Sequence, residues 1–474
     1  MDKSSFDFGM IGLGVMGRNF LLNMADHGFS VAGMNRSAGK VEMLKKEADP
    51  EVKVDGTTDL EEFVQSLKAP RCIMLLVKAG EAVDDMIEKL LPLTEDGDII
   101  IDGGNSHFTD TRRRIAYLEG QNRHFMGMGV SGGEEGARRG PSIMPGGDKK
   151  AWERVKPMLE AVSAKVDGTP CVSYLGKDAA GHYVKMVHNG IEYAIMQMIS
   201  ETYLLMKRGL GLNNDELYEV YKEWNEGVLK SFLVEITRDI FLQEDDKTDH
   251  RLIDVILDKA GAKGTGKWTS QDAMDLHFPV PSIDISVSMR DLSSYKDLQR
   301  KAAKLYDTQD TVIEGDKDAF IKKLHDALYF GVLMCYAQGM GMLRKASADL
   351  DMDIPLSEVV KIWRGGCIIR SVLLDTYWKI YNRDPEMSNL LLSEEVAPMV
   401  RENVGSTRDV IATASKAGYA IPGLSSALSY FDAFRRDKSP VNLIQAQRDY
   451  FGSHTYERID EEGSFHTEWD GSAK

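Results

Sequence analysis

Five polar residues share one face of a predicted helix in the middle of the chain. Downstream of Gly181 they occupy positions i, i+3, i+4, i+7 and i+8, as Lys185, His188, Asn189, Glu192 and Tyr193. That spacing aligns them in one stripe along an α-helix. An amine, an imidazole, an amide, a carboxylate and a phenol in such a stripe can supply a base, an acid and orienting donors for proton transfer. The alternative is a solvated helix face on which the lysine and the glutamate only form an ion pair.

The segment before this helix predicts a parallel, doubly wound sheet. Short apolar runs rich in β-formers alternate with amphipathic stretches such as residues 15–28 and 81–91, which is the rhythm of an α/β domain. Strands are expected at residues 6–12, 29–35, 72–77, 98–104 and 124–130. We assign this predicted domain to residues 1–177.

The segment after residue 177 predicts a large all-helical domain. Strand signals largely vanish there, and long stretches with helical periodicity dominate, so we assign residues 178–438 to this domain. Residues 217–227 and 356–366 share six of eleven positions, including a Trp and a Gly, and each follows a long predicted helix. This similarity indicates a diverged internal repeat; chance similarity between helical heptads is the alternative.

Residues 439–474 are expected to leave the helical pattern and form a C-terminal tail. The segment mixes charged residues with aromatic ones, namely Tyr450, Phe451, Tyr456, Phe465 and Trp469. Disordered tails lack this aromatic content, so the tail is expected to dock on another surface. A frayed terminus is the alternative.

Composition narrows the class of protein. The chain has 474 residues, 43% of them hydrophobic and 28% charged, which is typical of a soluble globular protein with two or three domains. A formal net charge of −16 argues against a nucleic-acid partner, and the apolar runs are too short to span a membrane. The four scattered cysteines indicate reduced thiols in a cytoplasmic protein. No cluster of His, Cys and Asp has the spacing of metal ligands, so no metal site is predicted.

A glycine motif marks a candidate dinucleotide site near the N-terminus. Gly12, Gly14 and Gly17 form G-x-G-x-x-G between the first predicted strand and a helix that starts at Val15. Such glycines allow a tight turn and bring a pyrophosphate to the helix N-terminus, whose free N–H groups suit an anion. The first domain is therefore predicted to be a Rossmann domain. The rest of the turn completes the predicted cofactor contacts, with Leu13, Val15 and Met16.

The end of the second predicted strand favours NADP over NAD. NAD sites place Asp or Glu there to accept a hydrogen bond from the ribose 2′-hydroxyl. This chain has Asn35, Arg36 and Ser37 instead. A guanidinium and a hydroxyl can bind a 2′-phosphate, and no carboxylate repels it.

Six motifs in a fixed order connect nearly the whole chain with one family. From Gly12 to Tyr456 they are GLGVMGRN, DGGNS, VSGGEEGARRGPSIMPGG, GHYVKMVHNGIEY, KGTGKWT and AQRDYFGSHTYE. Together they resemble the decarboxylating 6-phosphogluconate dehydrogenases. The shorter 3-hydroxy-acid dehydrogenases resemble the first domain and the lysine helix, but they lack the duplicated helical half and the tail.

The resemblance implies a reaction and a set of site residues. The reaction converts 6-phosphogluconate and NADP to ribulose 5-phosphate, CO2 and NADPH, in the pentose phosphate pathway. Lys185 is implied to be the general base and Glu192 the general acid. Contacts to the carboxylate and hydroxyls of the substrate are implied for Asn105, Ser131, Gly132, Gly133, His188 and Asn189, and contacts to its phosphate for Tyr193, Lys263, Arg290 and Arg448. The cofactor is implied to meet, in addition to the glycine turn, Val77, Lys78, Ala79 and Asn105.

The family resemblance also implies a homodimer. Arg448 and His454 look like residues that reach the substrate from the tail of the partner subunit. Taken one by one, several assignments have structural alternatives. Ser131 to Gly133 could be a strand-ending turn and Asn105 a turn residue, while Lys263 could lie in a surface loop and Arg290 in a surface ion pair.

The implied reaction sets the chemical roles. Oxidation of a hydroxyl β to a carboxylate gives a β-keto acid, and loss of CO2 then needs an electron sink at the new carbonyl. Neutral Lys185 can accept the hydroxyl proton, and its ammonium can then hydrogen-bond the carbonyl oxygen. Glu192 can protonate the carbon left behind. A lysine in this role needs a depressed pKa, which burial provides.

Two other functions remain open from the sequence. A non-decarboxylating 3-hydroxy-acid dehydrogenase would not need the phosphate-type cations Lys263, Arg290 and Arg448. A non-catalytic NADP-binding protein would not need an intact Lys185 and Glu192.

Overall fold

The first part of the chain forms one seven-stranded sheet. The computed structural model describes residues 5–306 and 311–469. Across the sheet the strands are β3 (Val54–Thr57), β2 (Val31–Met34), β1 (Phe8–Ile11), β4 (Cys72–Leu75), β5 (Ile99–Asp102), β6 (His124–Ser131) and β7 (Ser142–Gly147). All neighbours pair in parallel except β7, which is antiparallel to β6. The strand order reverses between β1 and β4, and ligands bind at such a point in open α/β sheets.

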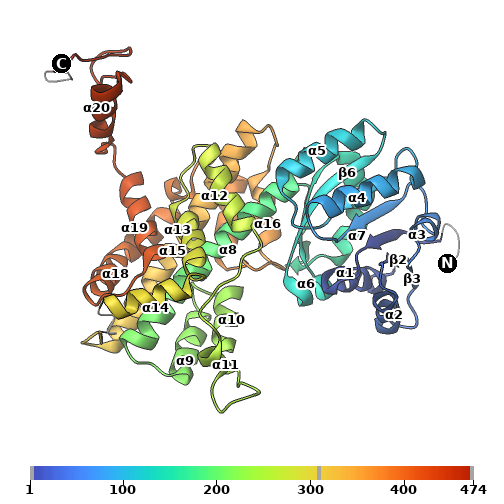
Figure 1. Ribbon diagram of the computed structural model, residues 1–474, viewed down its shortest axis with the longest axis horizontal. Helices are drawn as coiled ribbons and strands as arrows, with labels where there is room; N and C mark the ends of the chain where they lie inside the picture. Colours follow the sequence, from blue (N-terminus) through green and yellow to red (C-terminus); the bar gives the residue numbers. More distant parts are fainter. Residues whose placement is uncertain (1–4, 307–310, 470–474) are drawn as a thin grey trace. The chain divides into compact units, whose positions relative to one another are not determined.

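Helices pack on both faces of this sheet (Figure 1). One apolar cluster joins the strands to α1 (Val15–Asp26), α2 (Ala38–Glu47) and α7 (Lys149–Val162). The other joins them to α3 (Leu60–Gln65), α4 (Glu81–Leu90) and α5 (Phe108–Glu119). The remaining elements of this part are η1 (Leu91–Leu93), α6 (Gly133–Arg139), β8 (Lys165–Val166) and β9 (Thr169–Pro170). The predicted doubly wound Rossmann domain is confirmed.

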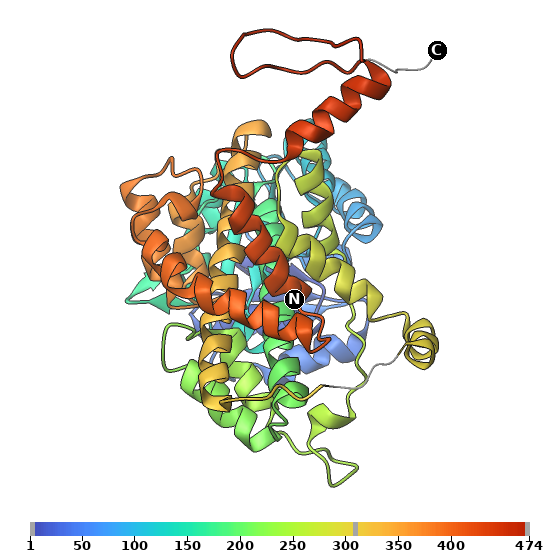
Figure 2. The ribbon, with the colours of Figure 1, turned by 90° about the vertical axis from the view of Figure 1, so that its left-hand side faces the viewer.

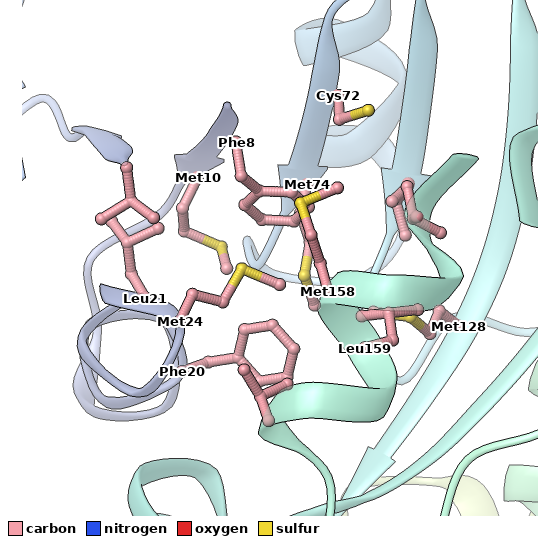
Figure 3. Packing of buried hydrophobic residues seen from close by; sticks show 14 of the residues in the cluster. Phe8, Met10, Phe20, Leu21, Met24, Cys72, Met74, Met128, Met158 and Leu159 are labelled. Atoms are coloured by element: carbon pink, nitrogen blue, oxygen red, sulfur yellow. The ribbon is translucent and has the colours of Figure 1, made fainter. Parts of the chain in front are cut away.

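Methionine contributes much of the first cluster. Figure 3 shows Met10 and Met74 of the sheet meeting Met24 of α1 and Met158 of α7, all fully or largely buried. Unbranched thioether side chains fill the irregular space between a twisted sheet and its helices.

Two strands of the seven-stranded sheet, β3 and β7, were not among those expected, and neither was the short β8–β9 pair. β3 has only Gly56 fully buried, because it is the edge strand next to β2, so its sequence lacks an apolar run. β7 contains Pro145, Gly146 and Gly147, residues that favour turns over strands. It forms because β6 supplies a long antiparallel partner and α8 (Ala180–Leu204) packs against it. Gly146 is needed there, since a Cβ on it would lie 2.2 Å from the backbone nitrogen of Gly181.

The chain after α8 continues as helices, as predicted. They are η2 (Leu205–Gly209), α9 (Asn214–Trp224), α10 (Phe232–Ile240), α11 (Leu252–Val255), α12 (Thr265–Asp275), α13 (Pro281–Leu292), α14 (Lys296–Leu305), α15 (Lys317–Asp349), α16 (Leu356–Trp363), α17 (Leu373–Arg383), η3 (Leu390–Leu392), α18 (Val396–Lys416) and α19 (Pro422–Phe434). α15 packs against both α8 and α18. Among the described residues, no helix combines the length and the apolar character needed to cross a membrane.

The two copies of the proposed repeat have the same local structure. A long helix precedes a short one in each copy, α8 before α9 and α15 before α16, and each short helix ends at a buried tryptophan, Trp224 or Trp363. The loops that follow meet in an antiparallel bridge between Ser231 and Ser371. The paired residues are within one position of equivalence in the two copies, which supports the interpretation as a duplication.

Residues 428–474 form a second compact unit, separate from residues 1–427. Its main element is α20 (Val441–Gly452), followed by a loop that runs out and returns, seen clearly in Figure 2. The expectation that the chain leaves the helical pattern at Pro440 is wrong, because α20 begins at the next residue. Pro440 precedes the helix, where its missing N–H costs nothing. Residues 470–474 of the predicted tail lie outside the described residues.

Candidate active site

The polar stripe of α8 is buried. Lys185 is 6% exposed, His188 0%, Asn189 8% and Tyr193 7%, and Glu192 is partly buried. The helix approaches the sheet closely because β6 carries glycine where they meet: a Cβ on Gly129 would lie 2.4 Å from the Cβ of Lys185. The alternative of a solvated helix face is therefore wrong. An unsolvated amine and carboxyl on one stripe are costly to bury without a function.

Burial shifts the pKa values of the acid and the base in opposite directions. Desolvation lowers the pKa of Lys185, although the nearby Glu192 and Cys367 oppose the shift. Desolvation raises the pKa of Glu192, against the influence of Lys185 and Arg290. Both shifts favour the neutral forms, so the site can hold an amine that accepts a proton and a carboxyl that donates one.

His188 stays neutral and connects three elements. Burial, reinforced by the positive charge of Lys185, lowers its pKa well below 6.5. Its Nδ1 lies 3.0 Å from Oδ1 of Asn189, and its Nε2 lies 3.4 Å from Oγ of Ser131 at the end of β6. Asn189 in turn donates from Nδ2 to Oγ1 of Thr265 at 3.0 Å. This chain of contacts orients the Asn189 amide and the Ser131 hydroxyl beside the polar stripe of α8.

The Ser131 to Gly133 segment is both a strand end and the start of α6. Gly132 has φ 118°, and a Cβ on it would lie 2.6 Å from the carbonyl oxygen of Gly366. Only glycine fits that conformation and that approach. The expected turn therefore exists, and it places the Ser131 hydroxyl against His188.

Arg290 and Tyr193 form one end of the site. The Arg290 guanidinium lies over the Tyr193 ring, 3.6 Å from its centroid, and donates to the carbonyl oxygen of Gly261 at 3.4 Å. Within residues 5–306 and 311–469 no ion pair involves Arg290, so a surface ion pair does not explain it. Lys263 lies in the exposed loop just before α12, close in sequence to Gly261. A guanidinium held flat on a ring still presents its edge to an anion.

A crevice opens where the strand order reverses. Of the predicted cofactor residues, its lining includes Gly12, Gly14, Asn35, Arg36, Val77 and Lys78. The three motif glycines have different tasks. A Cβ on Gly12 would lie 2.3 Å from the carbonyl oxygen of Leu76, and one on Gly17 would lie 2.0 Å from that of Gly12, whereas a Cβ on Gly14 would meet nothing within 4 Å. Gly12 and Gly17 close the turn, and Gly14 keeps the crevice open beside the N-terminus of α1.

Other predicted cofactor residues lie around this crevice but are not part of its lining. Leu13 and Gly17 are buried behind the turn, and Leu13 donates its N–H to Oδ1 of Asn35 at 3.2 Å. Val15 and Met16 begin α1, and Ser37 immediately precedes α2. Ala79 is in the loop after β4, and Asn105 is exposed after β5.

Arg114 holds the two loops that carry Lys78 and Asn105. It is 1% exposed and donates to Oδ2 of Asp102 at 3.2 Å and to the carbonyl oxygen of Gly80 at 3.0 Å. Asp102 also accepts from the N–H of Gly104 and from the hydroxyl of Ser106, so it braces both sides of Asn105. A buried carboxylate with this many donors is well satisfied.

Arg448 and His454 belong to the second compact unit and are both exposed. They lie near each other in the chain, on α20 and in the loop that follows it. Elsewhere, among the described residues, no group of three or more His, Cys, Asp or Glu could hold a metal ion.

The chain matches one family over nearly all of its length. Residues 7–176 match the NAD binding domain of 6-phosphogluconate dehydrogenase, and residues 181–469 match the C-terminal domain of 6-phosphogluconate dehydrogenase. The chain belongs to the 6-phosphogluconate dehydrogenase family.

Individual members of the family are similar from end to end. The NADP(+)-dependent, decarboxylating 6-phosphogluconate dehydrogenase of Bacillus subtilis is 52% identical over 98% of this chain and 99% of its own. The decarboxylating enzyme of Escherichia coli is 49% identical over the same shares. The Plasmodium falciparum 6-phosphogluconate dehydrogenase, whose solved structures include complexes with NADP+ and with 6-phosphogluconate, has a TM-score of 0.95 at 44% identity, covering 98% of this chain and 100% of its own.

Sequence reasoning missed four residues that the structure places in or beside the candidate site. Lys40 and Lys89 line the crevice, and Lys40 could have been found in the first turn of α2, shortly after Arg36. Thr265 lies inside the KGTGKWT motif but draws no attention until Asn189 is seen to donate to it. Arg114 is the third of three consecutive arginines, and only the fold shows which of them faces the buried Asp102.

Proposed function

We propose that the protein oxidises 6-phosphogluconate with NADP and releases CO2, giving ribulose 5-phosphate and NADPH. The observation that carries this proposal is the buried Lys185–Glu192 pair, whose pKa shifts both favour the neutral forms. Family membership adds to it, because relatives about 50% identical are named as decarboxylating 6-phosphogluconate dehydrogenases.

Lys185 acts as the base and then as the electron sink. The residues of the crevice would hold NADP, which would supply the hydride acceptor for the substrate carbon. The neutral amine of Lys185 takes the hydroxyl proton in that step. Its ammonium then donates a hydrogen bond to the new carbonyl oxygen and stabilises the enolate formed as CO2 leaves. The fully buried His188, kept neutral, adds no competing positive charge.

Glu192 completes the sequence as the acid. Its raised pKa keeps the carboxyl protonated in a larger share of molecules, so a proton is available for the carbon that has lost CO2. Ser131, Gly132, Gly133, Asn105 and the His188–Asn189 pair bind the carboxylate and hydroxyls of the substrate. The phosphate is bound by Tyr193, Lys263 and Arg290.

The residues of the crevice fit NADP as the cofactor. The open space at Gly14 admits a pyrophosphate, and Lys40, Lys89 and Arg36 supply positive charge for a 2′-phosphate. Leu13, Val15, Met16, Gly17, Ser37, Val77, Lys78 and Ala79 complete the proposed contacts. Asp85 also lines the crevice, but it is outnumbered by these cations.

Arg36 gives the test of cofactor choice. Replacing it with Ala should raise the apparent Michaelis constant for NADP about 10- to 150-fold, the effect of losing one charged hydrogen-bonded contact, with little change for NAD. Arg300→Ala, which removes an exposed guanidinium from α14, is the control. Equal effects of Arg36→Ala on the two cofactors would contradict the assignment.

The working unit is proposed to be a cytoplasmic homodimer. Residues 1–177 bind the dinucleotide, residues 178–438 bind substrate and form the dimer, and residues 439–474 bring Arg448 and His454 to the partner subunit's site. No nucleic acid or membrane takes part. Support comes from the family resemblance and from the separation of residues 428–474 as a compact unit.

Mixing two inactive variants tests the shared site. Lys185→Met and Arg448→Ala subunits, dissociated and reassociated together, form mixed dimers with one site that holds both intact groups. Activity should then recover toward about a quarter of the wild-type level on statistical mixing of a two-fold dimer. Absence of recovery, with subunit exchange verified by mass, would place Arg448 in its own subunit's site.

The overall activity is tested by absorbance of the reduced cofactor. The purified protein is expected to reduce NADP in the presence of 6-phosphogluconate and to release one CO2 per NADPH. NADPH without CO2 would indicate a non-decarboxylating 3-hydroxy-acid dehydrogenase. The absence of turnover with bound NADP would indicate a non-catalytic cofactor-binding protein.

A further inference from the structure

His454 lies in a strained loop of the second unit. The residues on both sides of it, Ser453 and Thr455, have φ of 49° and 59°. Neither is glycine, so each occupies a left-handed conformation that L-residues rarely adopt. Two such residues around one side chain persist only where the surroundings hold them in place.

Asp449 supplies most of that hold. It is 0% exposed, and its Oδ1 accepts hydrogen bonds from the N–H of Thr455 at 3.0 Å and from Nδ1 of His466 at 2.8 Å. Its Oδ2 accepts from the N–H of Thr467 and from Nε1 of Trp469, both at 3.0 Å. One carboxylate thus joins the start of the loop to its returning end.

The backbone of Asp449 adds a further contact to the loop. The side chain of Asp449 is ionised, as expected for a carboxylate that accepts several hydrogen bonds. The Ser453 N–H donates to the carbonyl oxygen of Asp449 at 2.9 Å. Burial by itself would raise the pKa of Asp449, but the hydrogen bonds from His466, Thr467, Trp469 and Thr455 lower it to about 2. The group is therefore a carboxylate at any pH at which the protein functions, and all its bonds are charge-assisted.

Gln445 links the same loop to Arg448. Its Nε2 donates to the carbonyl oxygen of Thr455 at 2.5 Å, and its Oε1 accepts from Arg448 at 3.1 Å. Thr455 is thus held at its N–H by Asp449 and at its carbonyl by Gln445. Gln445 thus connects Arg448 with Thr455, the residue next to His454. Arg448 and His454 are the two side chains that the tail contributes to the proposed site.

The returning end of the loop is closed by its own contacts. Tyr456 and Phe465 exchange two backbone hydrogen bonds of 2.8 Å, and their rings stack with centroids 6.3 Å apart. The loop seen beyond α20 in Figure 2 is therefore a closed turn held at its base by Asp449. Its geometry is formed by residues of the second unit alone.

We propose that Asp449 is a positioning residue that sets the conformation of His454, and with Gln445 that of Arg448, before the tail meets the substrate. This inference rests on the proposed function, in which both side chains contact 6-phosphogluconate. Pre-organisation of this kind lowers the entropy lost on binding, so its removal acts on substrate affinity.

The test is Asp449→Asn, which keeps the shape of the side chain but removes its charge and two of its acceptor sites. Asp460→Asn is the matched control, because it removes the same charge from the same loop, where Asp460 pairs with the exposed Arg458. We expect Asp449→Asn to raise the KM for 6-phosphogluconate at least tenfold, with kcat at saturating substrate and the Kd for NADP nearly unchanged. Asp460→Asn should alter none of the three.

A double-mutant cycle with His454→Ala separates positioning from loss of the whole tail. If Asp449 acts through His454, Asp449→Asn should have a much smaller effect in the His454→Ala protein than in the wild type. If the two substitutions instead raise the KM for 6-phosphogluconate independently, so that their fold-changes multiply in the double variant, the inference is overturned. It is also overturned if Asp449→Asn has the same KM as the Asp460→Asn control. Failure of the proposed function is distinguishable, because the wild-type protein itself would then not turn over 6-phosphogluconate.

Discussion

α8 and α15 are the long helices of the two repeat copies, and they bury very different residues. The buried half of α8 carries Lys185, His188, Asn189 and Glu192 in one stripe. The buried half of α15 is almost wholly apolar, and its main polar exception is Gln338. Gln338 is satisfied within the fold, since its Oε1 accepts from the N–H of Ser282 at 3.0 Å and its Nε2 donates to the Ser282 hydroxyl at 2.9 Å.

The buried polar side chains of the two helices differ in what they do: that of α15 stabilises the fold, whereas those of α8 are proposed to take part in the reaction. Both helices pack at the centre of the helical domain, α15 against α8 itself. In α15 a buried polar side chain completes the hydrogen bonding of a neighbouring helix start, which stabilises the fold. In α8 desolvation lowers the pKa of the buried amine and raises the pKa of the carboxyl, so both shifts favour the neutral forms. A duplicated element has thus kept its packing in both copies and its reactive groups in one.

Replacing Lys185 tests the chemical side of the comparison and has the largest expected effect. Lys185→Met should lower kcat by about 10³-fold or more, because in the proposed mechanism one residue serves both the oxidation and the decarboxylation. NADP binding should persist, and the free energy of unfolding should stay equal or rise, because a buried amine is removed.

Lys185→Arg sharpens this result. A guanidinium does not deprotonate near neutral pH, so turnover should be lost although positive charge is retained. Near-normal steady-state turnover of Lys185→Arg would show that Lys185 is not the base.

Glu201 shows that a buried carboxyl on α8 can also be structural. It accepts backbone hydrogen bonds from Gly423 and Leu424 at the start of α19, at 2.7 and 2.9 Å. Burial nevertheless raises its pKa from 4.5 to about 7. Its contribution to stability is therefore fully present below about pH 4.5 and is lost as the pH rises through about 7.

Glu201→Gln should remove this pH dependence. Between about pH 4.5 and pH 7, the free energy of unfolding of the wild type should fall relative to that of Glu201→Gln by on the order of 3 kcal/mol. Urea unfolding across this pH range measures the difference, with the exposed Glu153→Gln on α7 as the control. A parallel pH dependence in Glu201→Gln and the wild type would show that Glu201 titrates normally in the fold.

Gln338 tests the scaffold side and has the smallest expected effect. Gln338→Leu leaves the N–H of Ser282 without its acceptor, so the unfolding free energy should fall by about 1–3 kcal/mol. The folded fraction should keep its kcat, unlike Lys185→Met. Lys322→Leu, an exposed change on the same helix, is the control. A loss of kcat in Gln338→Leu that exceeds the loss of folded protein would break the distinction between the two helices.

Local sequence patterns predicted the parts of the fold that obey local rules. The glycine motif, the apolar strands β1, β2, β4, β5 and β6, and the helical periodicity beyond residue 177 each carry their own signal. β3 and β7 were missed because their formation depends on neighbours: β3 pairs along β2 at the edge, and β7 forms beside β6 in spite of Pro145. α20 was missed because its charged and aromatic composition hides an ordinary helix after Pro440.

The site divides in the same way. Residue type and spacing were sufficient to single out the stripe that holds Lys185 and Glu192, since helical periodicity places its residues on one face whatever surrounds the helix. The family resemblance then implied which of them is the base and which the acid. Their burial was not predictable from that spacing, because it depends on Gly129 of β6 allowing α8 to approach the sheet. Arg114 and Asp449 lacked any local signal, because each acts through hydrogen bonds to residues well apart in the sequence.

The sequence by itself determined which reactive side chains this protein contains and their order along the chain. Only the tertiary structure decided which of them are buried away from solvent. Desolvation depends on every element packed around a group. It lowers the pKa of Lys185 and raises that of Glu192, as the proposed base and acid require, while Gln338 on the equivalent helix only completes the packing.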